Sequence, residues 1–150
     1  MKKSFLLTIC AVALVLGFSS CVKDENTILD SDPEGTVIAN LLLTDDIKGW
    51  YERVYIEGLN DACIWMYMNN NFKGYYESIS CVGKVNGLSG IKKIPTSGWV
   101  GEAAVMPGYG YVVKDQGKYA RIYVVDYMES TSGGIMGCTI KYQAPWSPEN

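Results

Sequence analysis

From residue 36 onward, short apolar runs alternate with turn-forming residues. The runs are rich in Val, Ile and Tyr, and such runs bounded by Gly, Pro, Asn and Asp are typical of β-strands. They predict strands over residues 36–43, 51–58, 62–68, 77–85, 90–94, 99–106, 110–114, 119–128 and 135–143. The pair Asn86-Gly87 predicts a tight hairpin, because both residues accept positive φ. No apolar stripe with helical spacing persists beyond two turns, although residues 60–68 are long enough for a helix.

Strands at about ten-residue spacing predict an all-β domain. We expect an antiparallel β-sandwich or a small β-barrel of about 8–10 short strands, since strand count alone does not decide whether a sheet closes. The predicted domain covers residues 36–150 and is a single unit, because about 130 residues suit one domain.

Two of the predicted strands carry tyrosine and arginine along one face. Side chains alternate along a strand, so the aliphatic residues between them take the opposite face. Such a row can stack on a sugar ring and hydrogen-bond its hydroxyls, or it can pack across strands on a solvated sheet. The rows are Tyr51, Arg53 and Tyr55 in the first strand, and Tyr119, Arg121, Tyr123 and Tyr127 in the second.

Two tryptophans, Trp50 and Trp99, lie next to predicted turns. A large apolar side chain in a loop either meets a ligand or folds over the end of the core. The candidate ligand-binding residues are therefore these two tryptophans together with the tyrosines and arginines of the two rows, except Tyr127.

The sequence contains no histidine. This excludes Ser-His-Asp and Cys-His nucleophilic systems and histidine-based zinc sites. No CxxC or phosphate-binding loop is present either, so we predict no metal and no cofactor. Glycosidase chemistry needs two carboxyl groups about 5–10 Å apart, and no spacing singles out such a pair. We therefore expect no enzyme activity and rank a carboxylate-based glycoside hydrolase third among the functions considered.

The formal charge of the chain is −3, and no basic stretch or arginine cluster occurs. We therefore expect no nucleic-acid partner. Cys63, Cys81 and Cys138 all have apolar or small neighbours, which predicts buried small side chains. Their redox state cannot be predicted from spacing alone.

The N-terminus has the pattern of an export signal. Lys2 and Lys3 precede a mostly apolar run over residues 5–18, which is shorter than the about 20 residues needed to cross a bilayer. The run is followed by Ser19-Ser20-Cys21, and this junction resembles the signal of bacterial lipoproteins. The resemblance implies that residues 1–20 are removed and that Cys21 becomes the lipidated first residue. Removal of two lysines and no acid would take the formal charge from −3 to −5.

The next residues are polar and acidic. Lys23, Asp24 and Glu25 resemble the export signal of surface lipoproteins of Bacteroidetes. That resemblance implies an outer-membrane protein, held by its lipid anchor and facing the cell exterior. Residues 21–35 contain few apolar side chains and Pro33, so we expect the lipidated cysteine to be followed by a flexible acidic tether.

Several short segments in order extend the resemblance to residues 35–143. They are VGKVNGL, IPTSGW, PGYGYV, YARIYVVDY and TSGGIMGCTIKYQ. Together they resemble small Bacteroides surface lipoproteins that carry a domain of unknown function. The resemblance implies a lipoprotein with an all-β domain and supplies no catalytic residue.

The predicted location at the cell surface and the tyrosine-arginine rows together indicate one function. We expect a non-catalytic binding module for a glycan or another external polymer. The alternative is a structural or assembly subunit of an envelope protein complex, in which the tyrosine-arginine faces would be partner surfaces.

Overall fold

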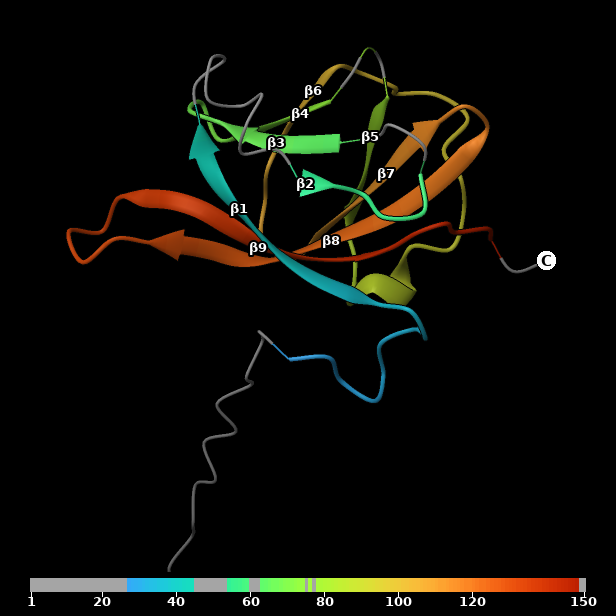
Figure 1. Ribbon diagram of the computed structural model, residues 1–150, viewed down its shortest axis with the longest axis horizontal. Helices are drawn as coiled ribbons and strands as arrows, with labels where there is room; N and C mark the ends of the chain where they lie inside the picture. Colours follow the sequence, from blue (N-terminus) through green and yellow to red (C-terminus); the bar gives the residue numbers. More distant parts are fainter. Residues whose placement is uncertain (1–26, 45–53, 60–62, 75, 77, 149–150) are drawn as a thin grey trace, which may run out of the picture.

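The computed structural model describes residues 27–44, 54–59, 63–74, 76 and 78–148. In this part of the chain the regular structure is almost all strand, and no α-helix is present. The strands form one sheet that curves into a nearly closed barrel (Figure 1). The all-β prediction is confirmed, and the architecture is the barrel rather than the sandwich.

The described residues form nine strands and one short 3-10 turn, η1, at Leu88–Gly90. The sheet order is β5-β7-β8-β9-β1-β3-β4-β6, with β2 beside β3. The strand bounds are β1 Val37–Thr44, β2 Val54–Tyr55, β3 Cys63–Tyr67, β4 Asn71–Gly74, β5 Ile79–Lys84, β6 Glu102–Ala104, β7 Tyr109–Asp115, β8 Lys118–Glu129 and β9 Ile135–Gln143.

The two ends of the sheet meet at one point. The backbone amide of Ile79 in β5 donates to the carbonyl of Val100 over 3.0 Å, and the amide of Val100 donates back over 2.8 Å. This bridge links β5 to the segment leading into β6. It reduces the length of unpaired strand edge that the barrel exposes.

One strand pair departs from the antiparallel arrangement that we predicted. β1 and β3 run parallel, with Leu43 opposite Met66 and Thr44 opposite Tyr67. A parallel pair needs a long crossover connection, and 18 residues separate these two strands. The other ladders among the described strands are antiparallel.

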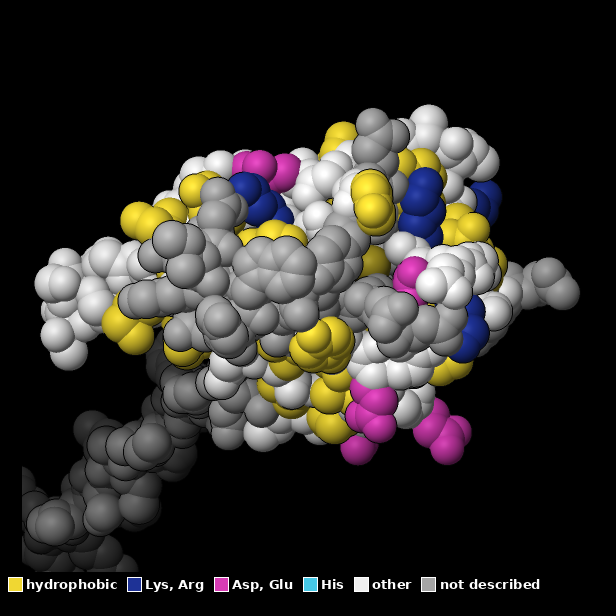
Figure 2. All heavy atoms as spheres, turned by 45° about the horizontal axis from the view of Figure 1, so that its top comes forward, with side chains coloured by type: hydrophobic (Ala, Val, Ile, Leu, Met, Phe, Trp, Pro, Cys, Tyr) yellow, Lys and Arg dark blue, Asp and Glu magenta, His cyan; other side chains and the backbone are white. Residues whose placement is uncertain are grey.

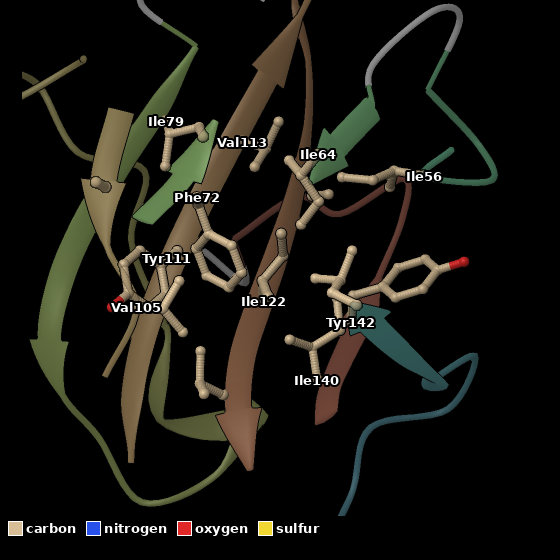
Figure 3. Packing of buried hydrophobic residues seen from close by; sticks show 14 of the residues in the cluster. Ile56, Ile64, Phe72, Ile79, Val105, Tyr111, Val113, Ile122, Ile140 and Tyr142 are labelled. Atoms are coloured by element: carbon tan, nitrogen blue, oxygen red, sulfur yellow. The ribbon is translucent and has the colours of Figure 1, made fainter. Parts of the chain in front are cut away.

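Aliphatic and aromatic side chains fill the barrel. Phe72 and Tyr111 meet edge to face at its centre, with ring centroids 5.0 Å apart, and Ile122 of β8 points toward them (Figure 3). Each large side chain buried in this way contributes roughly 1.5–3 kcal/mol. The alternation predicted for β8 places Ala120, Ile122 and Val124 in this core.

A bulge in β8 changes the face taken by the last tyrosine of the predicted row. Val124 pairs with Ile140, but Asp126 pairs with the next residue, Thr139, so Val125 is the extra residue. An extra residue inverts the side-chain alternation beyond it. Tyr127 therefore lies inside the barrel, where its hydroxyl donates to the carbonyl of Val105 over 2.6 Å.

A second apolar cluster covers the outer face of β7 and β8. We call the segment over residues 85–99 the roof, and its buried side chains Leu88 and Ile91 pack with Val112 and Trp146. Gly110 of β7 permits this contact, because a Cβ there would lie 2.7 Å from Cγ1 of Ile91. Part of the barrel wall is thus covered by apolar side chains on both faces.

The roof corrects two local predictions. Residues 90–94 do not form a strand, and Asn86-Gly87 does not close a hairpin but leads into η1. β5 pairs instead with β7, so the chain between them is free to cross the outer face. One further difference is that β4, at Asn71–Gly74, lies outside the predicted strands. Strand β3 agrees with the strand predicted over residues 62–68, so the described part of this segment is not helical.

The chain before β1 lies against the barrel. We call residues 29–36 the strap. Lys141 of β9 forms an ion pair with Asp32 over 2.6 Å, and the two side chains are only 5% and 7% exposed. Gln143 donates to the carbonyl of Glu34 over 2.8 Å. These contacts fall within residues 21–35, where we expected a flexible tether, and they form because a buried ammonium on β9 requires an acid and Asp32 supplies it.

The part of the chain that the structure describes holds no helix long and apolar enough to cross a membrane.

Candidate functional site

Several of the predicted functional residues lie outside the described residues. The predictions made for them therefore stay predictions. They are the lipidation site Cys21, the export signal Lys23, Asp24 and Glu25, and the candidate ligand-binding residues Trp50, Tyr51 and Arg53.

Tyr55, the described member of the first tyrosine-arginine row, stands apart from the second row. It lies on β2, which pairs with β3, and its side chain is 58% exposed. In the sheet order β9 and β1 separate β3 from β8. The structure therefore does not place Tyr55 on the same surface as the row of β8.

The row on β8 lies beneath the roof. Tyr119 and Tyr123 are half-buried against the second apolar cluster, and the ring of Trp99 is 6.3 Å from that of Tyr119. The ammonium of Lys114 lies 4.3 Å from the centre of the Trp99 ring. Tyr119 and Tyr123 share one face, as their spacing predicts, but with Trp99 they form a packed wall rather than an open platform.

Arg121, at the middle of the row, is 9% exposed and firmly held. Its Nε donates to Oε1 of Gln143 over 2.8 Å, and a terminal nitrogen donates to the carbonyl of Ile91 in the roof over 3.0 Å. The guanidinium carbon also lies 5.3 Å from the centre of the Trp146 ring. Contacts from β9, from the roof and from the C-terminal segment thus fix the plane of the guanidinium.

The segment after β9 contributes to this arrangement. The backbone amide of Trp146 donates to the carbonyl of Tyr119 over 2.7 Å. Trp146 itself is only 5% exposed, so its ring supports Arg121 and does not offer a face to a sugar. This separates the observed site from the aromatic platform that the sequence predicted.

A pocket of about 580 Å³ opens beside Arg121. It lies between the strap, the roof, β8 and the C-terminal segment, and a volume of this size is within the range typical of small-molecule sites. Its lining is Ser31, Pro33, Ser89, Ile91, Lys92, Arg121, Gln143, Pro145, Trp146 and Ser147.

Sequence reasoning found one member of this pocket and missed most of the others. Arg121 was a candidate, whereas Gln143, Lys92 and the serines were not. Gln143 had a usable signal, because the hairpin joining β8 and β9 places it directly opposite Arg121. The strap and roof residues had none, because nothing in their local sequence shows where those segments cross the barrel.

The chemistry of the pocket is that of hydrogen-bond donors. An arginine, a lysine and three serine hydroxyls face or border it. Among the described residues, no cluster of three or more acidic or cysteine side chains is arranged to hold a metal ion. On the face shown in Figure 2, the described acidic and basic side chains are scattered over several elements.

The cysteines differ from one another. Cys138 is buried in the barrel, and burial raises the pKa of its thiol to about 12. Cys81 is exposed, which corrects the prediction of a buried side chain. Its strand, β5, is at one end of the sheet order, and the register of β5 with β7 shifts directly after Cys81. The side chain of Cys63 lies outside the described part of the chain.

No protein-family model, curated protein or solved structure matches this chain. The Arg121 pocket is therefore the feature of the molecule from which a function can be inferred.

Proposed function

We propose that the protein is a non-catalytic binding module, tethered to the outer membrane through Cys21 and facing the cell exterior, that holds a glycan in the Arg121 pocket. The observation that carries the proposal is a nearly buried arginine, fixed by two hydrogen bonds and an aromatic ring, at the wall of a pocket of about 580 Å³.

The first support is the rigidity of the arginine. A buried charge is costly unless hydrogen bonds compensate it, and here Gln143 and Ile91 accept two of them. Because the guanidinium is already oriented, a ligand would not have to order that side chain on binding. Preorganised polar groups of this kind are typical of ligand sites.

The second support is the match between the lining and sugar hydroxyls. Ser31, Ser89 and Ser147 each carry a hydroxyl that both donates and accepts, and Lys92 adds an ammonium donor. The four groups come from three separate segments of the chain. A ligand with several hydroxyls along its length suits such a distribution better than an apolar ligand does.

The second candidate function is an assembly subunit of an envelope protein complex. It is favoured by the exposed apolar side chains of Leu42 on β1 and Met136 on the neighbouring strand β9. Two exposed side chains make only a small patch, whereas a stable interface buries about 800 Å² on each partner. The pocket therefore supports the glycan proposal more strongly.

The test is a glycan-array screen of residues 21–150 with Cys21→Ser, so that no lipid is attached. We expect binding that Arg121→Lys weakens at least tenfold, because lysine keeps the charge but loses the planar fork. Lys92→Ala, on an exposed lining residue, should weaken binding without affecting the fold. Lys118→Ala is the matched control, because this exposed lysine of β8 does not line the pocket.

Two results would overturn the proposal. One is glycan binding that neither pocket variant changes, with thermal unfolding showing both variants folded. The other is the absence of glycan binding together with specific cross-links to neighbouring envelope proteins, which would support the assembly function instead.

A further inference from the structure

We infer that the glycan is held as an extended chain across two neighbouring pockets, so that the protein recognises a stretch of polysaccharide rather than a short sugar. The second pocket lies between β5 and the roof, and it shares two lining residues with the Arg121 pocket. This inference rests on the proposed function and specifies the length of its ligand.

The second pocket is as large as the first. It has a volume of about 590 Å³, which is also within the range typical of small-molecule sites. β5 contributes Ser80, Cys81 and Val82 to its wall, and the roof contributes the rest, including Lys93 and Ser97. We call it the β5 pocket.

One short run of the roof, residues 89–93, separates the two pockets. Ser89 lines the Arg121 pocket, and Lys93 lines the β5 pocket. Ile91 and Lys92 line both. Each pocket has the size needed for one drug-sized molecule, which corresponds to about two or three sugar units. Because the two pockets border the same two residues, a longer chain that crosses the roof at Lys92 occupies both.

The walls of the two pockets are fixed before any ligand arrives. The carbonyl of Ile91 accepts the hydrogen bond from Arg121 over 3.0 Å, and the Ile91 side chain is buried in the second apolar cluster. Across the β5 pocket, the hydroxyl of Ser80 donates to the carbonyl of Ser97 over 3.3 Å and ties the end of the roof to β5. A chain would therefore bind without first having to order either wall.

The lining of the β5 pocket suits the repeating units of a glycan. Val82 and Pro95 are half-buried and offer apolar surface, whereas Ser97 and Lys93 are exposed and offer polar groups. A sugar ring carries C–H groups on its faces and hydroxyls around its edge, so it can use both kinds of surface. A chain that reaches both pockets gains affinity because its second contact is intramolecular.

The first test is a length series of neutral oligosaccharides. Calorimetry with the Cys21→Ser chain would measure binding of malto-, xylo-, manno- and cello-oligosaccharides. We expect at least one series to gain tenfold or more in affinity between about three and about six units. Lys93→Ala should reduce this gain at least threefold and leave binding of the three-unit chain unchanged. Lys84→Ala is the matched control, because this exposed lysine of β5 lines neither pocket.

The second test uses Cys81 to report occupancy of the β5 pocket. Its thiol is exposed and lines that pocket, so iodoacetamide can reach it in the unliganded protein. A saturating chain of about six units should slow modification of Cys81 at least fivefold, because the chain covers the thiol. A saturating chain of about three units, held in the Arg121 pocket, should leave the rate unchanged.

The outcomes separate the inference from the proposed function. If the six-unit chain shows no gain in affinity, or gains affinity without protecting Cys81, the inference is overturned and the proposed function stands. Failure of all four series to bind at any length would overturn both.

Discussion

The ion pair between Asp32 and Lys141 is expected to hold the strap on the barrel. Asp32→Asn keeps the size of the side chain and one acceptor oxygen but removes its charge. Lys141 is 5% exposed, so its ammonium would remain nearly buried without a counter-charge. Removal of one partner of a buried ion pair typically costs about 3–5 kcal/mol, and we expect a loss in this range at neutral pH.

The loss has an upper limit set by the strap itself. If detaching the strap costs less free energy than keeping Lys141 buried and unpaired, the strap will open and expose the ammonium to water. The amides of Asp32 and Thr36, which donate to carbonyls within the strap, would then exchange with solvent faster than amides of the barrel core. Urea unfolding measures the global loss, and hydrogen exchange measures the local opening.

Two control variants test whether the ion pair holds the strap on the barrel. Asp30→Asn removes an exposed acid from the same segment and should change stability by no more than about 0.5 kcal/mol. Asp32→Leu combined with Lys141→Met removes both charges and should recover much of the loss, since an apolar pair often replaces a buried ion pair at little cost. If Asp32→Asn behaves like Asp30→Asn in both assays, the pair does not hold the strap.

Two further predictions concern the barrel. Gly137→Ala should lower the free energy of unfolding by about 1–3 kcal/mol or more in urea titrations, because a Cβ there would fall 2.1 Å from the carbonyl oxygen of Leu41 on the adjacent strand. The control is Gly134→Ala, because a Cβ at that position has its nearest neighbour at 3.5 Å. Equal losses of stability in the two variants would contradict the close packing at Gly137. Iodoacetamide at pH 8 should modify Cys81 in the native protein and Cys138 only after unfolding, because burial raises the pKa of the Cys138 thiol to about 12. Peptide mass spectrometry measures the modification of each cysteine. Modification of both at the same rate would show that the barrel opens readily.

The strands were predictable where alternation is regular. In β8 the sequence pattern correctly separates Ala120 and Ile122 from Arg121, because an apolar core on one face imposes period two. It fails at Tyr127, since the bulge at Val125 leaves no local mark in the sequence. β4 was missed for a related reason. Its polar first residue, Asn71, is held by a side-chain hydrogen bond to Glu102 of β6, a contact that spans 31 residues.

The pocket was predictable only at its centre. Alternation indicates that Arg121 lies on the outer face of β8, but it cannot show what covers that face. The cover comes from Ile91, 30 residues away, and from the C-terminal segment that includes Trp146. An outward arginine in a strand is usually solvated, so the sequence favoured an open surface. Long-range packing of the roof turned that surface into the wall of a pocket.

Under the proposed anchoring through Cys21, the strap has a mechanical consequence. It leads directly back toward the proposed anchor, and Ser31 and Pro33 also line the pocket. A pull on a bound glycan would pass from Arg121 on β8 into the barrel and from the barrel to the strap. The strap is held by the ion pair of Asp32 with Lys141 and by a hydrogen bond from Gln143, whereas β1 pairs with β9 at six positions. Under tension the strap would therefore open before β1 leaves the sheet.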